Sequence, residues 1–267
     1  MTEEAKMPFT AHLEELRRRL ICCFIAIAIG GLVSYFFKER VIKILTSPLI
    51  EALKTEAQKS GNKTDVLQTL IFTGPHEAFV TYIKLAFICG MVLAIPIILY
   101  HFWRFIAPGL YTHERKYLFP VICLSTVFFL LGILFGYFVV MPFGMKFFVS
   151  FTSSELMPLI RMKEYISFTS KFLFAFGIVF ELPLFSLFLT KLGIINARML
   201  RTYRKYAILV IFILAAILTP PDVLTQVMMA GPLIILYEVS IFISQIFGKK
   251  KQEEESEVVT SASGGGE

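Results

Sequence analysis

The sequence predicts an all-α protein that crosses a membrane several times, and three observations support this fold class. Of the 267 residues, 56% are hydrophobic and only 17% are charged, whereas soluble domains average about 25% charged residues. The apolar residues gather in long runs, several of which approach the ~20 residues that a membrane-spanning helix needs. The 28 phenylalanines, against a single tryptophan, suit side chains that face lipid without a polar partner.

The apolar runs predict six transmembrane helices, at about residues 20–37, 79–100, 118–140, 166–190, 206–218 and 226–247. Pro96 and Pro183 fall inside two of them, where we expect kinks because proline lacks a backbone donor. The fifth run would be only about 20 Å long. We therefore expect the last two helices to form a short hairpin, beside which the bilayer is thinned or accessible to water.

The domain organisation follows from these spans. Residues 1–247 form a single membrane domain, and the tail 248–267, which passes from lysines to acids and then to Ser and Gly, is expected to be disordered. The long loop 38–76 shows helical periodicity around Pro48 and predicts one or two short helices. Because no small-x-small cleavage site follows the first apolar run, we expect that run to remain as an anchor and not to be a signal peptide.

Lysine and arginine counts predict the orientation. With six spans, one face carries fifteen of these residues, including both terminal segments, and the other carries nine. The positive-inside rule then places both termini in the cytoplasm. The net charge of +6 is explained by this topology, so we expect no nucleic-acid partner.

The cysteines do not indicate a metal or redox site. Cys22, Cys23, Cys89 and Cys123 all lie in apolar runs, without a CxxC pair or a histidine at ligand spacing. We interpret them as small buried hydrophobic residues, and we expect no cofactor, no metal and no enzymatic activity.

Two acidic residues near the cytoplasmic face suggest a cation-binding surface. Glu15 lies in a helical segment that runs directly into the first span, and Glu114 is the acid of the aromatic-rich segment between the second and third spans. Together the two carboxylates could bind two guanidiniums through charge-assisted hydrogen bonds. Simpler readings are also available: Glu14 and Glu15 each have an arginine four residues later, and the aromatic residues suit an interfacial belt.

Acids inside the predicted spans also need an explanation. Glu181 and Glu238 lie too deep to reach water by stretching, and an unpaired carboxylate there would cost several kcal/mol. Each is therefore a candidate functional residue, with an interhelical hydrogen bond as the alternative. Asp222, one turn before Gln226, is explained as a helix N-cap.

Several segments in order resemble one family. They read HLEELRRRL before the first span, WRFIAPGLYTHER after the second, FGYFVVMP, FGIVFELP, LTPPDVLTQ and LIILYE, with Pro48 in the outer loop. Over nearly the whole chain this pattern is similar to the TatC family, the multi-spanning receptor of the twin-arginine protein translocase.

The resemblance implies a subunit that binds signal peptides with paired arginines and helps export folded proteins, driven by the proton-motive force. Single-span partners of the TatA and TatB type would dock near the last two helices, within a larger complex that is likewise expected to hold several copies of this chain. The implied signal-peptide site comprises Glu15, Glu114, Leu16, Arg17 and Phe105. A membrane pocket would contain Glu181, Tyr137 and Gln226, and Pro48, Asp222 and Glu238 would be functionally sensitive.

Two other functional classes fit the sequence less well. A secondary transporter predicts an inverted repeat, but the short final hairpin has no counterpart in the first half. An intramembrane hydrolase would need a GxSxG or HExxH motif or a paired-acid arrangement across spans, and the sequence has none of these.

Overall fold

A computed structural model describes residues 9–59, 70–106, 118–151, 159–218 and 223–263. Within these ranges the regular structure is helical, apart from an isolated parallel β-bridge between Ile71 and Arg161. The predicted all-α fold class is confirmed. Five helical stretches there are long and apolar enough to cross a bilayer: His12–Phe36, Pro75–Ile106, Phe119–Ser150, Met162–Lys191 and Thr225–Ile246.

The chain divides into two compact units. The first comprises Met1–Val127 with Met145–Ser170, and the second comprises Phe128–Gly144 with Lys171–Glu267. Each unit is described by itself below.

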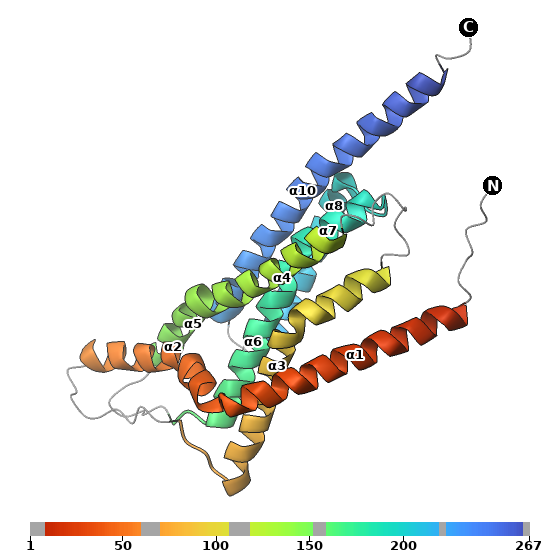
Figure 1. Ribbon diagram of the computed structural model, residues 1–267. Coiled ribbons are helices and arrows are strands. Elements are labelled where there is room, and N and C mark those ends of the chain that lie inside the picture. The colour runs from red at the N-terminus through yellow and green to blue at the C-terminus, as the bar shows by residue number, and fades with distance from the viewer. Residues whose placement is uncertain (1–8, 60–69, 107–117, 152–158, 219–222, 264–267) are drawn as a thin grey trace. The chain divides into compact units, whose positions relative to one another are not determined.

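The first unit is built on a pair of long helices, α1 (Phe9–Phe36) and α3 (Pro75–Ile106), which pack against one another (Figure 1). Both exceed their predicted spans, and α3 continues through Pro96. Because α1 is one unbroken helix, the charged segment around Glu15 is rigidly continuous with the first span, as the sequence predicts.

Glycines set the close approach of α1 and α3. A Cβ added at Gly90 would lie 2.4 Å from the Gly31 backbone nitrogen and 2.8 Å from the Ile27 carbonyl oxygen, and one at Gly30 would lie 2.8 Å from the Gly90 carbonyl oxygen. Small residues let transmembrane helices approach closely enough for their backbones to touch. This crossing fixes how the N-terminal half of α1 meets the C-terminal half of α3.

In the described part of the long loop 38–76, residues Lys38–Lys59 form one helix, α2, with Pro48 inside it and buried. The sequence predicted one or two short helices here. The hydroxyl of Tyr165, on α6 (Met162–Phe180), donates to the Leu45 carbonyl at 2.7 Å, so this bond ties α2 to the start of α6.

A polar cluster that the sequence analysis did not identify joins two loops of the first unit. Glu77 is only 5% exposed, and its Oε2 accepts from the Thr73 backbone N–H and hydroxyl, both at 2.9 Å. Arg161 donates to the Thr73 hydroxyl at 3.0 Å and to Glu164 at 2.8 Å. Only a weak signal was present in the sequence, because Thr73 lies four residues before Glu77, one more than the three-residue spacing of a capping box.

The third predicted helix extends further than expected. The prediction ended it at residue 140, but α4 (Leu118–Phe135) continues through a π-helical turn, η3 (Gly136–Val140), into α5 (Met141–Ser150). The Met141 backbone N–H donates to the Gly136 carbonyl, and this π bond precedes Pro142, which has no N–H of its own. The helix thus accommodates the proline by widening one turn.

The fourth predicted helix is interrupted where a kink was expected. α6 ends at Phe180, and α7 (Leu182–Lys191) begins after Glu181, with Pro183 in its first turn. In the second unit, Gly132 allows close contact with α6, because a Cβ there would lie 2.5 Å from the Phe176 carbonyl oxygen.

The second unit ends in three helices, α8 (Ala197–Thr202), α9 (Arg204–Leu218) and α10 (Val223–Ser263). α9 has 15 residues and is about 22 Å long, so the predicted shortness of the fifth helix is confirmed. At that length α9 falls short of the ~30 Å hydrocarbon core, and the six-span count stays a prediction. The predicted shortness of the sixth helix is wrong, because the Thr225–Ile246 stretch of α10 is long enough to cross a bilayer.

α10 also differs from its predicted end. It continues past residue 247 as far as Ser263, through the segment for which composition predicted disorder. Lysine, glutamine and glutamate, which make up residues 249–255, are good helix formers, and this accounts for the continuation of the helix beyond the apolar run.

Candidate functional site

The N-terminal half of α1 presents its side chains on distinct faces. Glu15, Leu16 and Arg19 are partly buried, whereas Glu14 and Arg17 are exposed. Residues four apart share a helix face, so Glu15 and Arg19 lie together. The exposed Arg17, which the family resemblance places in the signal-peptide site, is not among the residues that line the groove described below.

Glu15 already holds a guanidinium group. Its Oε1 accepts from Arg19 Nε at 3.0 Å and also from Arg19 Nη2, and the two side chains are 27% and 14% exposed. This bond confirms the predicted i,i+4 pair. Both donors of this pair bond to the same carboxylate oxygen, Oε1.

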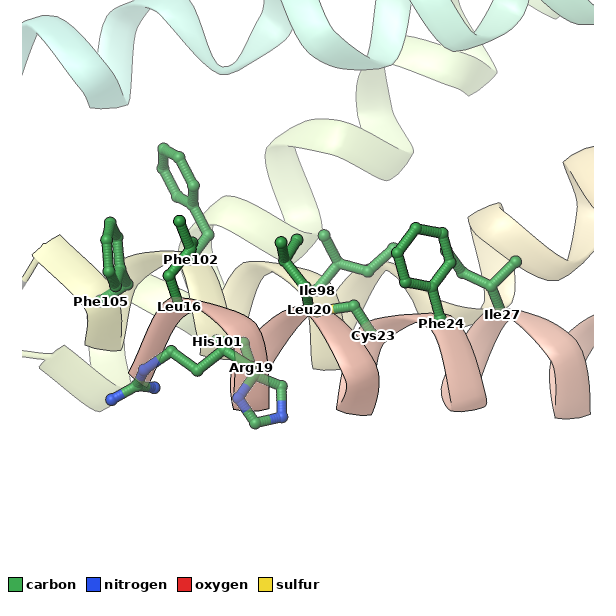
Figure 2. A pocket seen from close by; sticks show the side chains of 10 residues that line it. All are labelled: Leu16, Arg19, Leu20, Cys23, Phe24, Ile27, Ile98, His101, Phe102 and Phe105. Carbon is green, nitrogen blue, oxygen red and sulfur yellow. The ribbon is translucent and has the colours of Figure 1, made fainter. Parts of the chain in front are cut away.

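A groove lies between α1 and α3 beside this pair. Its volume is about 250 Å³, and it is lined by Leu16, Arg19, Leu20, Cys23, Phe24, Ile27, Ile98, His101, Phe102 and Phe105. Figure 2 shows the apolar side chains gathered along α1 and α3, while the polar ends of Arg19 and His101 point away from them. We call this feature the α1–α3 groove.

Phe105 closes one end of the groove. Its ring stacks on that of His12, with the ring centroids 4.3 Å apart and the planes at 15°. The stack joins the last turn of α3 to the first turns of α1. The structure thus brings together Glu15, Leu16 and Phe105, three of the five residues that the resemblance assigned to the signal-peptide site.

Trp103 is not part of an interfacial aromatic belt, which was one reading of its segment. It is 1% exposed, and its indole N–H donates to the Ser125 hydroxyl at 3.0 Å. A buried indole needs such a partner. Trp103 therefore anchors the end of α3 against α4.

Two predicted site residues, Glu114 and Asp222, lie outside the described residues. The pairing of Glu114 with Glu15 and the N-cap role of Asp222 both stay predictions.

Glu181 occupies the break between α6 and α7. It is partly buried, its backbone N–H donates to the Ile178 carbonyl at 3.1 Å, and its carbonyl accepts from Phe185 at 2.8 Å. The acid therefore sits where Pro183 forces a change in helical hydrogen bonding.

The other two members of the predicted membrane pocket lie on different elements. Tyr137 is in the π-helical turn, a feature often found at functional sites. Gln226 donates to the Phe212 carbonyl at 3.0 Å and so ties α10 to α9. A pocket shared by Glu181, Tyr137 and Gln226 stays a prediction.

Glu238 has a structural explanation. It forms an ion pair with Arg204 at 2.8 Å, and the side chains are 43% and 46% exposed. The interhelical bond that the sequence left open as the alternative for Glu238 is confirmed, because Arg204, the first residue of α9, pairs with it. A functional role for Glu238 stays a prediction. Nearby, Tyr237 donates to the Leu200 carbonyl at 2.8 Å, so this end of the hairpin is held by polar contacts.

Within the described residues, no group of three or more His, Cys, Asp or Glu side chains is arranged to hold a metal ion. The four cysteines are free thiols, and the expectation that they are buried is wrong: Cys22, Cys23 and Cys89 are partly exposed and Cys123 is exposed.

Comparison with known proteins identifies the family. The sequence model of the family described as Sec-independent protein translocase protein (TatC) matches residues 11–232. A protein of that name from Desulforapulum autotrophicum is 50% identical over 93% of this chain and 88% of its own length. Another, from Aquifex aeolicus, is 41% identical over 91% of this chain and 97% of its own length.

Solved structures agree. A crystal structure described as the twin arginine translocase receptor TatC has a TM-score of 0.76 and 41% identity, and the match covers 87% of this chain and 97% of that one. A second crystal structure of that receptor, in DDM, has a TM-score of 0.77 and 40% identity over 88% and 99% of the two chains. Taken together, these likenesses show that this chain belongs to the TatC family and is a multi-pass membrane subunit of a protein translocase, not an enzyme.

Proposed function

We propose that this chain is the signal-peptide receptor of a twin-arginine translocase, and that Glu15 binds one of the two arginines of the signal. The observation that carries this proposal is the Glu15 carboxylate holding the Arg19 guanidinium through two nitrogen atoms. A signal arginine would replace Arg19 in the same geometry. Glu114 is proposed to receive the second arginine.

The chemistry of the contact supports discrimination between arginine and lysine. A guanidinium is a planar fork that gives two directed bonds to one carboxylate, whereas an ammonium is a compact point charge. An exposed ion pair contributes at most about 1 kcal/mol. The partial burial of Glu15 beside an apolar groove strengthens the contact by excluding water from one side.

The orientation and partners form the second part of the proposal. The excess of lysine and arginine on the terminal face supports an N-in, C-in arrangement in the cytoplasmic membrane. Single-span TatA- and TatB-type subunits are proposed to dock at α9 and α10, in a complex with several copies of this chain. The shortness of α9 and exposed apolar residues such as Leu209 and Ile217 support docking there. The proton-motive force would drive export.

Photo-crosslinking of a twin-arginine signal peptide to the full-length protein in membranes tests the receptor site. Glu15→Ala and Glu114→Ala should each remove most of the crosslinked product. Glu14→Ala is the matched control, because Glu14 is the adjacent acid and is exposed. Unchanged crosslinking in the Glu15→Ala, Glu114→Ala double variant would exclude the proposed site.

A further inference from the structure

We propose that the stretch from Lys191 to Tyr206, here called the α8 segment, binds the headgroup of an anionic phospholipid. This inference goes beyond the receptor function and takes only the membrane orientation from that proposal. In this orientation the α8 segment lies at the cytoplasmic leaflet, whose anionic lipids create a negative surface potential.

The α8 segment carries an unbalanced positive charge. It contains no acid and five basic residues: Lys191, Arg198, Arg201, Arg204 and Lys205. Helix α2 also has five basic residues, but three glutamates lie among them. Clusters of about four to eight Lys or Arg beside a transmembrane helix are typical of segments that bind anionic lipids.

Polar contacts hold the α8 segment against α10, beside which α8 lies (Figure 1). Arg204 pairs with Glu238 at 2.8 Å, and Arg201 donates to the Gln245 side-chain oxygen at 2.6 Å. Glu238 neutralises Arg204, whereas Gln245 has no charge to offer Arg201. The segment is therefore held in place while Arg201 keeps its positive charge.

Three cations of the segment are available to an anion. Arg198, Arg201 and Lys205 are exposed, and none of them forms an ion pair with a residue that the structure describes. They are spaced three and four residues apart, so helical geometry makes them neighbours. Helical bonding continues where α8 meets α9, because the Tyr203 N–H donates to the Met199 carbonyl at 3.0 Å. Guanidinium groups bind phosphate oxygens through two directed hydrogen bonds.

The neighbouring side chains favour a lipid over a free phosphate. Met199, Tyr203 and Tyr206 are 42%, 51% and 54% exposed. Met199 and Tyr203 are one helical turn apart, and the ring centroids of Tyr203 and Tyr206 are 6.1 Å apart. Tyrosine is enriched at the headgroup level of bilayers. Only a lipid has acyl chains that this apolar and aromatic patch can contact while the cations bind its phosphate.

A headgroup bound here would set the depth of α9 in the bilayer. α9 begins at Arg204, directly after Tyr203, and Lys205 lies in its first turn. Because α9 is shorter than the hydrocarbon core, a headgroup held at its start stabilises the thinned bilayer that so short a helix needs.

A lipid titration of the purified full-length protein in neutral detergent, followed by native mass spectrometry, tests the site. Phosphatidylglycerol, which is anionic, should bind at least about tenfold more tightly than zwitterionic phosphatidylcholine. Glycerophosphoglycerol, the same headgroup without acyl chains, should bind far more weakly than phosphatidylglycerol. Equal affinity for the two lipids would overturn the proposal. So would equal affinity for phosphatidylglycerol and its free headgroup, because the segment would then be a site for free phosphate.

Removing the three available cations should weaken phosphatidylglycerol binding at least about tenfold, since each basic residue near an anionic surface contributes roughly a fivefold factor. The variant combines Arg198→Gln, Arg201→Gln and Lys205→Gln. Undiminished affinity in this variant would overturn the proposal.

A variant of α2 serves as the matched control. Arg40→Gln, Lys43→Gln and Lys54→Gln together remove three exposed cations from that helix, and this variant should bind phosphatidylglycerol like the unaltered protein. An equal loss of affinity in both triple variants would overturn the proposal, because binding would then follow the net charge and not a site.

One substitution keeps the test valid if the triple variant of the α8 segment fails to fold. Arg198→Glu reverses the charge of an exposed side chain that loses no ion pair with a described residue. Thermal unfolding without lipid should match that of the unaltered protein, and phosphatidylglycerol affinity should fall at least about fivefold. Unchanged affinity would contradict the proposal. No signal peptide takes part and a micelle has no two sides, so these results stand apart from those of the receptor test.

Discussion

Replacing Gly90 by alanine should separate α1 from α3. The added Cβ would lie 2.4 Å from the Gly31 nitrogen, 2.6 Å from the Gly31 Cα and 2.8 Å from the Ile27 carbonyl oxygen, whereas ordinary contacts between carbon atoms are about 3.5–4.0 Å. All three neighbours are backbone atoms, so no side chain can rotate aside. The helices must therefore move apart by about 1 Å.

The energetic cost follows from two opposing effects. Overpacking of this kind costs about 1–3 kcal/mol, while alanine is favoured over glycine inside a helix by about 0.5–1 kcal/mol. Because the clash involves rigid backbone, we expect the upper part of the first range and a net destabilisation of about 2 kcal/mol. The displacement should also loosen the His12–Phe105 stack and the α1–α3 groove, and so weaken signal-peptide binding.

Thermal unfolding of the purified protein and a signal-peptide binding assay measure both effects. Two glycines serve as controls: a Cβ at Gly31 would meet its nearest neighbour at 3.5 Å, and one at Gly231 would meet nothing within 4 Å. Gly31→Ala and Gly231→Ala should be neutral or slightly stabilising. If Gly90→Ala is as stable as Gly31→Ala and binds the peptide equally well, the crossing does not set the geometry of the site.

Three further experiments test other residues. Arg19→Gln removes the intrachain competitor for Glu15 and should tighten twin-arginine peptide binding up to about fivefold, the equivalent of ~1 kcal/mol; weaker binding in a titration would assign Arg19 a direct role instead. Arg204→Gln and Glu238→Gln, combined in a double-mutant cycle of thermal stability, should show a coupling of about 0.2–1 kcal/mol that shrinks in high salt; a coupling independent of salt would contradict an ion pair exposed to solvent. Glu181→Leu should impair export of a folded reporter while membrane insertion stays normal, and undiminished export would leave Glu181 with a structural role alone.

Much of the fold could be predicted because it depends on local patterns. Apolar runs located the long helices, and Pro183 predicted the break at Glu181, since proline acts through its own missing donor and fixed φ. The continuity of the HLEELRRRL segment with the first span followed from helical periodicity. These features can be predicted without knowing which helices are neighbours.

Features that depend on neighbouring helices were missed. Gly90 and Gly30 are ordinary glycines in the sequence, and their contact becomes evident only when α1 and α3 are placed together. The Trp103 indole donates a hydrogen bond to Ser125, 22 residues away in sequence. Glu238 accepts one from Arg204, 34 residues away. A charge or indole that looks unpaired along the chain can thus be satisfied across helices.

The candidate site likewise combines residues that local sequence patterns predicted with a feature that depends on which helices are neighbours. Glu15 and Phe105 were identified through the family motifs, and the Glu15–Arg19 pair from its spacing. The α1–α3 groove was not foreseen, because its lining comes from two helices about eighty residues apart in sequence. In the sequence, Leu20 and Cys23 look like ordinary residues of an apolar run. Their place in the groove becomes evident only from the packing of α1 against α3.

Pull-down of the full-length protein with a twin-arginine peptide and with its dilysine counterpart tests the central claim most directly. If Glu15 binds a guanidinium selectively, the arginine peptide should retain the protein and the lysine peptide should not. Glu15→Ala should abolish this difference between the two peptides, whereas Glu14→Ala should preserve it. Equal retention by the two peptides would contradict the receptor function proposed for this chain.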